Sequence, residues 1–210
     1  MALAKRSFKQ QRSEQTYEAI LEAAARVFPK LGFEGTQTPD IAREAGISTG
    51  AVYRYFDDKR HVFLEMLEVE LAKVRAEVDR RLEVVVASAA TGDPAKAVGL
   101  LIDTLFEQVK KDAALSRVFA ALSLTDPDVA AIRARAEAHD RGIVAAMIEA
   151  AIPREVIPDP HAAALVIYNA AIGSATELAL RPKRAKGPSE VEVKAALERM
   201  LVRYVFARPA

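Results

Sequence analysis

The sequence predicts an all-α protein, in which an N-terminal three-helix domain of the helix-turn-helix type is joined by a long helix to a larger helical domain. Apolar residues recur three and four positions apart through nearly the whole chain, which is the spacing of one helix face. Glycine and proline interrupt this pattern at intervals, and no segment alternates as a strand would. We therefore expect about nine helices and no sheet.

Composition and motif content argue against catalysis. The 210-residue chain has no cysteine, which rules out disulfides, thiolate metal sites and cysteine nucleophiles. His61, His139 and His161 lie far apart, without the spacing of a metal site. No phosphate-binding loop or serine nucleophile motif occurs. We expect a protein that is not an enzyme and that binds no metal and no cofactor.

The chain also lacks the sequence features of secretion and membrane insertion. No signal-peptide apolar segment is found. The longest uncharged stretch near the C-terminus, residues 161–176, is shorter than the ~20 residues that a membrane-spanning helix needs. These features predict a cytoplasmic protein with no membrane partner.

Positive charge is concentrated in residues 1–12. The net charge is only +1, but four cations precede the first acidic residue, Glu14: Lys5, Arg6, Lys9 and Arg12. We interpret residues 1–12 as a basic flexible arm. It either lies along phosphates or enters a minor groove of DNA, or it is simply a solvated terminus.

Residues 13–58 have the pattern of a small three-helix domain. Ser13 is placed to cap the first helix, which Pro29 should distort in its last turn and Gly32 should end. The second helix is expected to open at Thr38, whose hydroxyl would cap it, with proline at the next position.

The segment from Thr38 to Phe56 is the most informative part of the sequence. Gly46 can adopt the left-handed conformation of a sharp helix exit, and a short third helix is expected from Ser48 to Phe56. Two short helices joined by so tight a turn are the arrangement that presents the second helix to a major groove of DNA.

Residues 59–210 are predicted to form the larger domain. Asp58 is placed to cap the long fourth helix, and proline marks the starts of three later ones, at Pro94, Pro127 and Pro160. A basic loop, residues 181–188, should separate the last two helices. That loop is interpreted as solvated, with a second nucleic-acid patch as the alternative.

Residues 17–63 resemble the DNA-binding domain of TetR-type transcriptional repressors. The shared landmarks keep their order and spacing: Ile20-Leu21-Glu22-Ala23-Ala24, Phe28, Gly32-Phe33, Thr36, Asp40-Ile41-Ala42-Arg43-Glu44-Ala45-Gly46-Ile47-Ser48, Gly50-Ala51-Val52-Tyr53-Arg54-Tyr55-Phe56 and Lys59. Two residues depart from the family pattern. Pro39 replaces a polar or basic DNA-facing residue, and Pro29 is unusual in the first helix.

The resemblance implies a set of DNA contacts. Thr38 and Lys59 would bind phosphates, and Arg54 would donate to a base edge such as guanine. The other positions that would face DNA are Ser48, Thr49, Gly50, Tyr53 and Tyr55. Two alternatives stay open: Ser48 is equally suited to a plain helix cap, and either tyrosine could pack beneath the helix instead.

The resemblance also implies a pocket among helices four to eight for a small, largely apolar effector. His139 falls on the inward stripe of the seventh helix, where it would either orient the effector or be a satisfied core histidine. Further candidates for effector contact are Gln108, Arg117, Tyr168, Asn169 and Glu177.

In the family the last two helices usually form a homodimer interface. The eighth helix is apolar around much of its circumference, which suits a second partner, although a single core could also account for it. We expect two recognition helices to enter successive major grooves about 34–36 Å apart on a near-palindromic operator, from which the effector releases the protein. The alternative is a helical small-molecule-binding protein that has lost DNA recognition.

Overall fold

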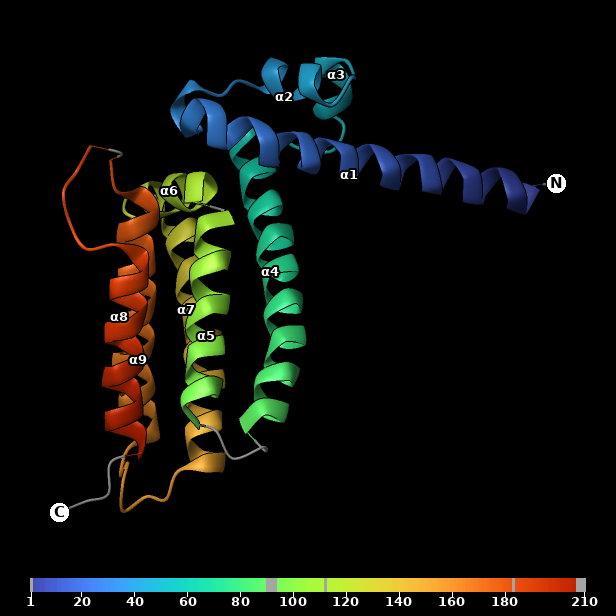
Figure 1. Cartoon of the computed structure of the whole chain (residues 1–210). Helices are drawn as coiled ribbons and strands as arrows, with labels where there is room; N and C mark the ends of the chain where they lie inside the picture. The colour runs from blue at the N-terminus through green and yellow to red at the C-terminus, as the bar shows by residue number, and fades with distance from the viewer. Residues whose placement is uncertain (1, 90–93, 112, 183, 207–210) are drawn as a thin grey trace. The chain divides into compact units, whose positions relative to one another are not determined.

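The structure is a computed structural model that describes residues 2–89, 94–111, 113–182 and 184–206. These residues contain nine α-helices and no strand, so the predicted all-α fold is confirmed (Figure 1). The helices are α1 (Ala2–Gly35), α2 (Thr38–Glu44), α3 (Thr49–Val52), α4 (Lys59–Ala89), α5 (Pro94–Lys111), α6 (Ala113–Leu122), α7 (Pro127–Ala151), α8 (Pro160–Leu180) and α9 (Glu190–Phe206).

The chain forms two compact units. The N-terminal unit comprises Met1–Lys73 and Ala114–Ala130, and the C-terminal unit comprises Val74–Ala113 and Ala131–Ala210. The helices α4 and α7 each begin in the N-terminal unit and end in the C-terminal one.

The N-terminal unit has an aromatic core. Phe28, Phe56 and Phe63 are all buried, and the ring of Phe63 meets that of Phe28 edge-on at 4.8 Å between centroids. Val129 and part-buried apolar residues of α6 pack into the same cluster. The first turn of α7 therefore belongs to the hydrophobic core of the helix-turn-helix unit.

Two local expectations for this unit need correction. The first helix begins at Ala2 instead of after Ser13, so Ser13 is inside α1 and caps nothing. At Gly32 the backbone leaves helical geometry with φ 74°, which confirms the predicted stop, although a short helical continuation follows to Gly35. The N-cap of α2 is Gln37, whose backbone N–H donates to the Asp40 carboxylate at 3.0 Å, and Thr38 is the first helical residue.

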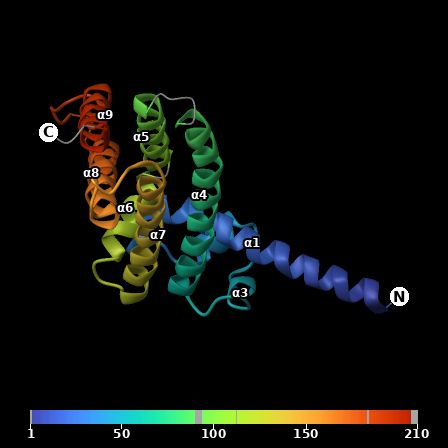
Figure 2. The same cartoon turned by 90° about the horizontal axis from the view of Figure 1, so that it is seen from below.

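In the C-terminal unit, α8 and α9 lie side by side and pack with α5 (Figures 1 and 2). One core cluster joins Ile102 and Phe106 of α5 to Leu197 and Leu201 of α9. A second cluster lies between the end of α7 and the start of α8. On α9, Leu197 and Leu201 are buried, whereas Met200 and Tyr204 are exposed.

Of the described helices, α8 is long and apolar enough to span a membrane by length and composition alone. A core helix passes the same test. Ala163, Ala164, Ala171 and Ala175 of α8 are buried, which fits close packing against neighbouring helices of the C-terminal unit.

Candidate functional sites

The turn between α2 and α3 is built as the sequence predicts. Gly46 has φ 69°, the left-handed conformation that glycine adopts without steric cost. The Ser48 hydroxyl then caps α3 by accepting from the Ala51 N–H at 3.2 Å. The fully helical part is shorter than expected, Thr49–Val52, and the chain continues to Phe56 in turns.

One side of this segment packs inward and the other is open. Ala51 and Val52 are buried, whereas Ser48, Gly50, Tyr53 and Arg54 are exposed. No atom lies within 4 Å of the position that a Cβ at Gly50 would occupy. The surface between Ser48 and Arg54 is therefore accessible to a bulky partner, and Thr49 is half-buried beside it.

Two exposed side chains of this segment have unoccupied polar groups. Tyr53 is 56% exposed. Arg54 forms no ion pair or hydrogen bond with any described residue, so its guanidinium is free to donate to an external acceptor. On α2, Arg43 is also exposed and pairs only with Asp40 at 3.2 Å. The sequence interpretation omitted Arg43, although its place one helical turn from Asp40 indicated an outward face.

Three residues predicted to contact DNA are buried in the N-terminal unit or make contacts within it. Thr38 is 6% exposed, which leaves its hydroxyl little access to a phosphate. Tyr55 is half-buried against the Tyr17 ring, and its hydroxyl accepts from Ser13 at 3.2 Å. This arrangement favours the packing alternative for Tyr55 and leaves the phosphate alternative to Tyr53.

The third of these residues is Lys59, at the start of α4. Its Nζ donates to the carbonyl oxygens of Phe33 at 2.9 Å, Glu34 at 3.3 Å and Thr36 at 3.0 Å, and it lies 4.7 Å from the centre of the Phe33 ring. All three ammonium donors are thus used to hold the end of α1. A phosphate contact by Lys59 stays a prediction.

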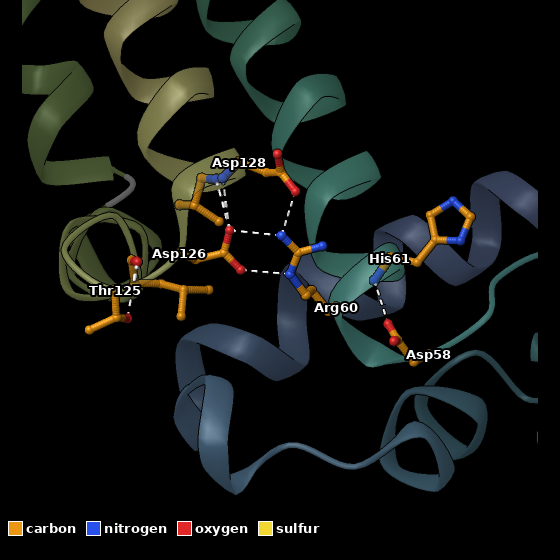
Figure 3. Close-up of polar contacts among 8 residues, drawn as sticks. Asp58, Arg60, His61, Thr125, Asp126 and Asp128 are labelled. Atoms are coloured by element: carbon orange, nitrogen blue, oxygen red, sulfur yellow. Dashed lines mark hydrogen bonds and ion pairs between the residues drawn. The ribbon is translucent and has the colours of Figure 1, made fainter.

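An ion-pair cluster joins the starts of α4 and α7 inside the N-terminal unit (Figure 3). Arg60 donates to both oxygens of Asp126, at 2.6 and 2.8 Å, and to Asp128 at 2.6 Å. Asp126 also caps α7 by accepting from the N–H groups of Asp128 and Val129. The Arg60 guanidinium, with these caps, lowers the pKa of Asp126 to about 2.

The C-terminal unit contains a cavity of about 580 Å³, within the size range of small-molecule sites. All of its lining residues belong to that unit and come from α4, α5, α7, α8 and α9 or lie directly after α7. Most are aliphatic, among them Val78, Leu101, Ile143 and Met147.

The polar groups of the wall include a hydrogen-bonded pair. The Tyr168 hydroxyl on α8 donates to Oδ2 of Asp140 on α7 at 3.1 Å. Burial raises the pKa of Asp140 above its ordinary value, against the opposing effects of Tyr168, His139 and Arg75. Burial, and then the charge of Asp140, also raises the pKa of Tyr168, so its hydroxyl remains a donor.

The predicted effector contacts divide into two groups. Gln108, His139 and Tyr168 line the cavity. Arg117, Asn169 and Glu177 do not: Arg117 belongs to the N-terminal unit, Asn169 is exposed on α8, and Glu177 pairs with Arg181 at 3.0 Å.

Sequence reasoning missed Asp140 and Arg75 as cavity residues. Asp140 had a usable signal, because it occupies the inward stripe of α7 between Ala136 and Ile143, where an acidic residue is unusual.

The basic arm is helical in its backbone from Ala2 onward, as part of α1. Its cations Lys5, Arg6 and Lys9 have side chains outside the described residues, and Arg12 is exposed.

Comparison with known proteins identifies the N-terminal segment. Residues 20–66 match the family model of bacterial regulatory proteins, tetR family. An uncharacterized HTH-type transcriptional regulator of Bacillus subtilis, YfiR, is 39% identical over 64 residues, which are 30% of this chain and 31% of that protein. The HTH-type transcriptional regulator AcrR of Shigella flexneri is 34% identical over 64 residues, 30% of each. The chain thus spans about a third of the length of these curated relatives.

Solved structures extend the likeness to the whole fold. A transcriptional regulator from Rhodococcus superposes with a TM-score of 0.72 over 92% of this chain and 99% of that one, at 23% identity. A regulator from Saccharomonospora viridis in complex with choline has a TM-score of 0.71, with 20% identity over 93% and 100%. FadR of Bacillus subtilis in complex with stearoyl-CoA has a TM-score of 0.60, with 18% identity over 92% and 100%.

All of these relatives and fold neighbours are named as regulators. The match over residues 20–66, at the segment where the geometry leaves an accessible surface, shows that this part of the chain is similar to the tetR family of bacterial regulatory proteins.

Proposed function

We propose that the chain is an effector-responsive transcriptional regulator, which acts as a repressor by occupying an operator through the segment Ser48–Arg54. The observation that carries this proposal is the open surface of that segment, capped by Ser48 and ending at the unpaired Arg54. In such units the second helix enters the major groove, and hydroxyls and N–H groups at its start suit phosphate oxygens.

On the DNA, Arg54 is the base-reading candidate, because a free guanidinium can donate twice to a guanine edge. Ser48, Thr49, Gly50 and Tyr53 would lie along the adjacent backbone. Thr38, Tyr55 and Lys59 would support this surface from behind, through the contacts they make inside the unit.

We further propose a homodimer through α8 and α9. Five of the large apolar residues exposed in the described part of the chain lie on these two helices: Leu165, Val166, Val191, Met200 and Tyr204. Exposed apolar groups clustered on neighbouring helices are typical of a surface that a partner covers. A two-fold dimer presents two reading segments to a near-palindromic operator.

The cavity of the C-terminal unit is the proposed effector site. Its aliphatic wall and few polar groups have the character of a small-molecule site. Two fold neighbours are complexes with choline and with stearoyl-CoA, which supports ligand binding by the equivalent unit. A DNA partner also implies a cytoplasmic location.

Fluorescence anisotropy with labelled DNA from the promoter region upstream of the chain's own gene tests the proposal. Binding that is at least about 10³-fold tighter than binding to an unrelated duplex at the same salt concentration is expected. Equal affinity for both duplexes would instead support the second candidate, a small-molecule-binding protein without DNA recognition.

A further inference from the structure

The cavity wall contains an acidic group whose solvation is incomplete. Asp140 lines the cavity, and its carboxylate has a single hydrogen-bond partner among the described residues, Tyr168, which occupies Oδ2. A carboxylate held against aliphatic side chains is costly unless further donors or a cation reach it. Oδ1 has no hydrogen-bond partner among the residues that the structure describes.

The charged residues of the cavity wall also favour a positively charged ligand. Two carboxylates line it, Asp79 and Asp140. Of the two lining arginines, Arg81 is already paired with Glu77 and Glu107, both at 2.8 Å. Among the described lining residues, Arg75 and His139 are the groups that remain to offset them.

The rest of the wall determines which kind of cation fits. Tyr168 is the one aromatic residue of the described lining, and a single ring does not form the aromatic cage that holds a quaternary ammonium. A carboxylate oxygen with free lone pairs favours a cation that has N–H donors. Ile143, Met147 and Ile152 follow Asp140 along the chain and line the same cavity, so an aliphatic body has an apolar surface to lie against.

We propose that the effector is an amphipathic amine, whose protonated primary or secondary amino group donates to Asp140 while its aliphatic body fills the cavity. This inference rests on the proposed regulatory function and names the chemical class of its ligand. Tyr168 is a positioning residue, because its hydroxyl holds one carboxylate oxygen and turns the other toward the ligand. An alkylamine is protonated at neutral pH, as the lysine side chain is.

Isothermal titration calorimetry of the full-length protein tests the inference with four probes that share a ten-carbon alkyl chain: decylamine, decyltrimethylammonium, decanol and decanoate. Decylamine is expected to bind at least about tenfold more tightly than the other three, the effect of one charge-assisted hydrogen bond. Asp140→Asn should remove that advantage and leave decanol binding unchanged. Glu155→Gln, which removes the same charge from an exposed position outside the cavity lining, should change decylamine affinity by less than about threefold.

Other results overturn the inference. They are equal affinity for all four probes, tightest binding of decanoate with a loss in Arg75→Met, or decylamine affinity that is unchanged in Asp140→Asn. If Asp140→Asn does not fold, the ranking of the four probes on the unaltered chain decides. Anisotropy with promoter DNA separates the two proposals. Specific DNA binding without amine preference overturns the ligand class alone, and amine preference without DNA binding supports the ligand class and overturns the regulatory role.

Discussion

Arg54 differs from Arg26, Arg43 and Lys59 because none of the described residues pairs with its guanidinium. Arg26 and Arg43 are each paired with a carboxylate, and Lys59 with carbonyl oxygens. A charge that the fold leaves unpaired on an accessible surface is the one that an operator can engage at least cost.

We predict that Arg54→Ala weakens operator binding by ~1–3 kcal/mol and relaxes the preference at one base pair, since a bidentate contact to one base is lost. Anisotropy against a set of single-base operator variants measures both effects. Arg184→Ala, in the exposed loop before α9, removes the same charge and should leave specific affinity nearly unchanged. A uniform loss over all variants would make Arg54 a phosphate contact instead.

Lys59 has a different expected phenotype. Its ammonium donates to three carbonyl oxygens at the end of α1. Because these hydrogen bonds would be lost, Lys59→Ala should lower the free energy of unfolding by about 1–3 kcal/mol. Urea unfolding followed by circular dichroism gives this value, and the exposed Lys30→Ala should stay within about 0.5 kcal/mol of the parent. Suppose instead that stability is unchanged and that the slope of log binding constant against log salt concentration falls in magnitude by about one. Lys59 would then be a phosphate contact.

At the scale of elements, the starts of α4 and α7 are held together by Arg60 and Asp126. Both helices continue to residues that line the cavity. This pair fixes the two helix starts relative to one another within the N-terminal unit.

The Arg60–Asp126 pair should give the protein a specific acid sensitivity. The pKa of Asp126 in the folded chain, about 2, is below its ordinary value, so its stabilising effect is fully present above about pH 4 and is lost as the pH falls toward 2. Asp126→Asn keeps a side-chain oxygen that can cap α7 but loses the charge. Its thermal midpoint should lie below that of the parent at pH 6, and the difference should shrink between pH 4 and pH 2. A constant difference would show that the ion pair contributes nothing.

The elements themselves were largely predictable from the sequence, because they depend on local signals. Gly46, Ser48 and Asp58 fix the turn and two helix starts through their own backbone or side-chain groups, and the structure shows these contacts. The start of α1 was not predictable in the same way. Ser13 has the residue type of a cap, but a serine inside a helix has the same sequence appearance.

The candidate sites were less predictable, because they depend on which side chains already have partners. The motif indicated Lys59 as readily as Arg54, and only the positions of three carbonyl groups distinguish them. In the cavity, the sequence indicated His139, because it is a lone histidine on an apolar stripe. The hydrogen bond between Asp140 and Tyr168 joins α7 to α8, so no pattern in the neighbouring sequence predicts it.

At the scale of the whole molecule, the exposed apolar residues of α8 and α9 should control assembly. We predict that Val166→Glu, at a position 63% exposed, converts the proposed dimer to a monomer and abolishes tight operator binding, since a charge would be buried at the proposed interface. Sedimentation velocity measures the first effect and anisotropy the second. Leu124→Glu, on the N-terminal unit and 83% exposed, should leave the dimer intact. A Val166→Glu dimer would place the interface elsewhere.

The helix-turn-helix unit is assembled from two separate stretches of chain, and this limits how the protein can be divided or recombined. Its hydrophobic core includes Val129 and the part-buried Leu115, Val118, Phe119 and Leu122. These residues are separated from Lys73 in the sequence by Val74–Ala113, which belong to the other unit. A fragment cut at Lys73 would leave Phe63, Met66 and Leu67 without part of their packing. Exchange of operator specificity between relatives by swapping a contiguous N-terminal cassette therefore carries a hidden requirement: the graft must also match the surface of α6 and the first turn of α7 in its new host.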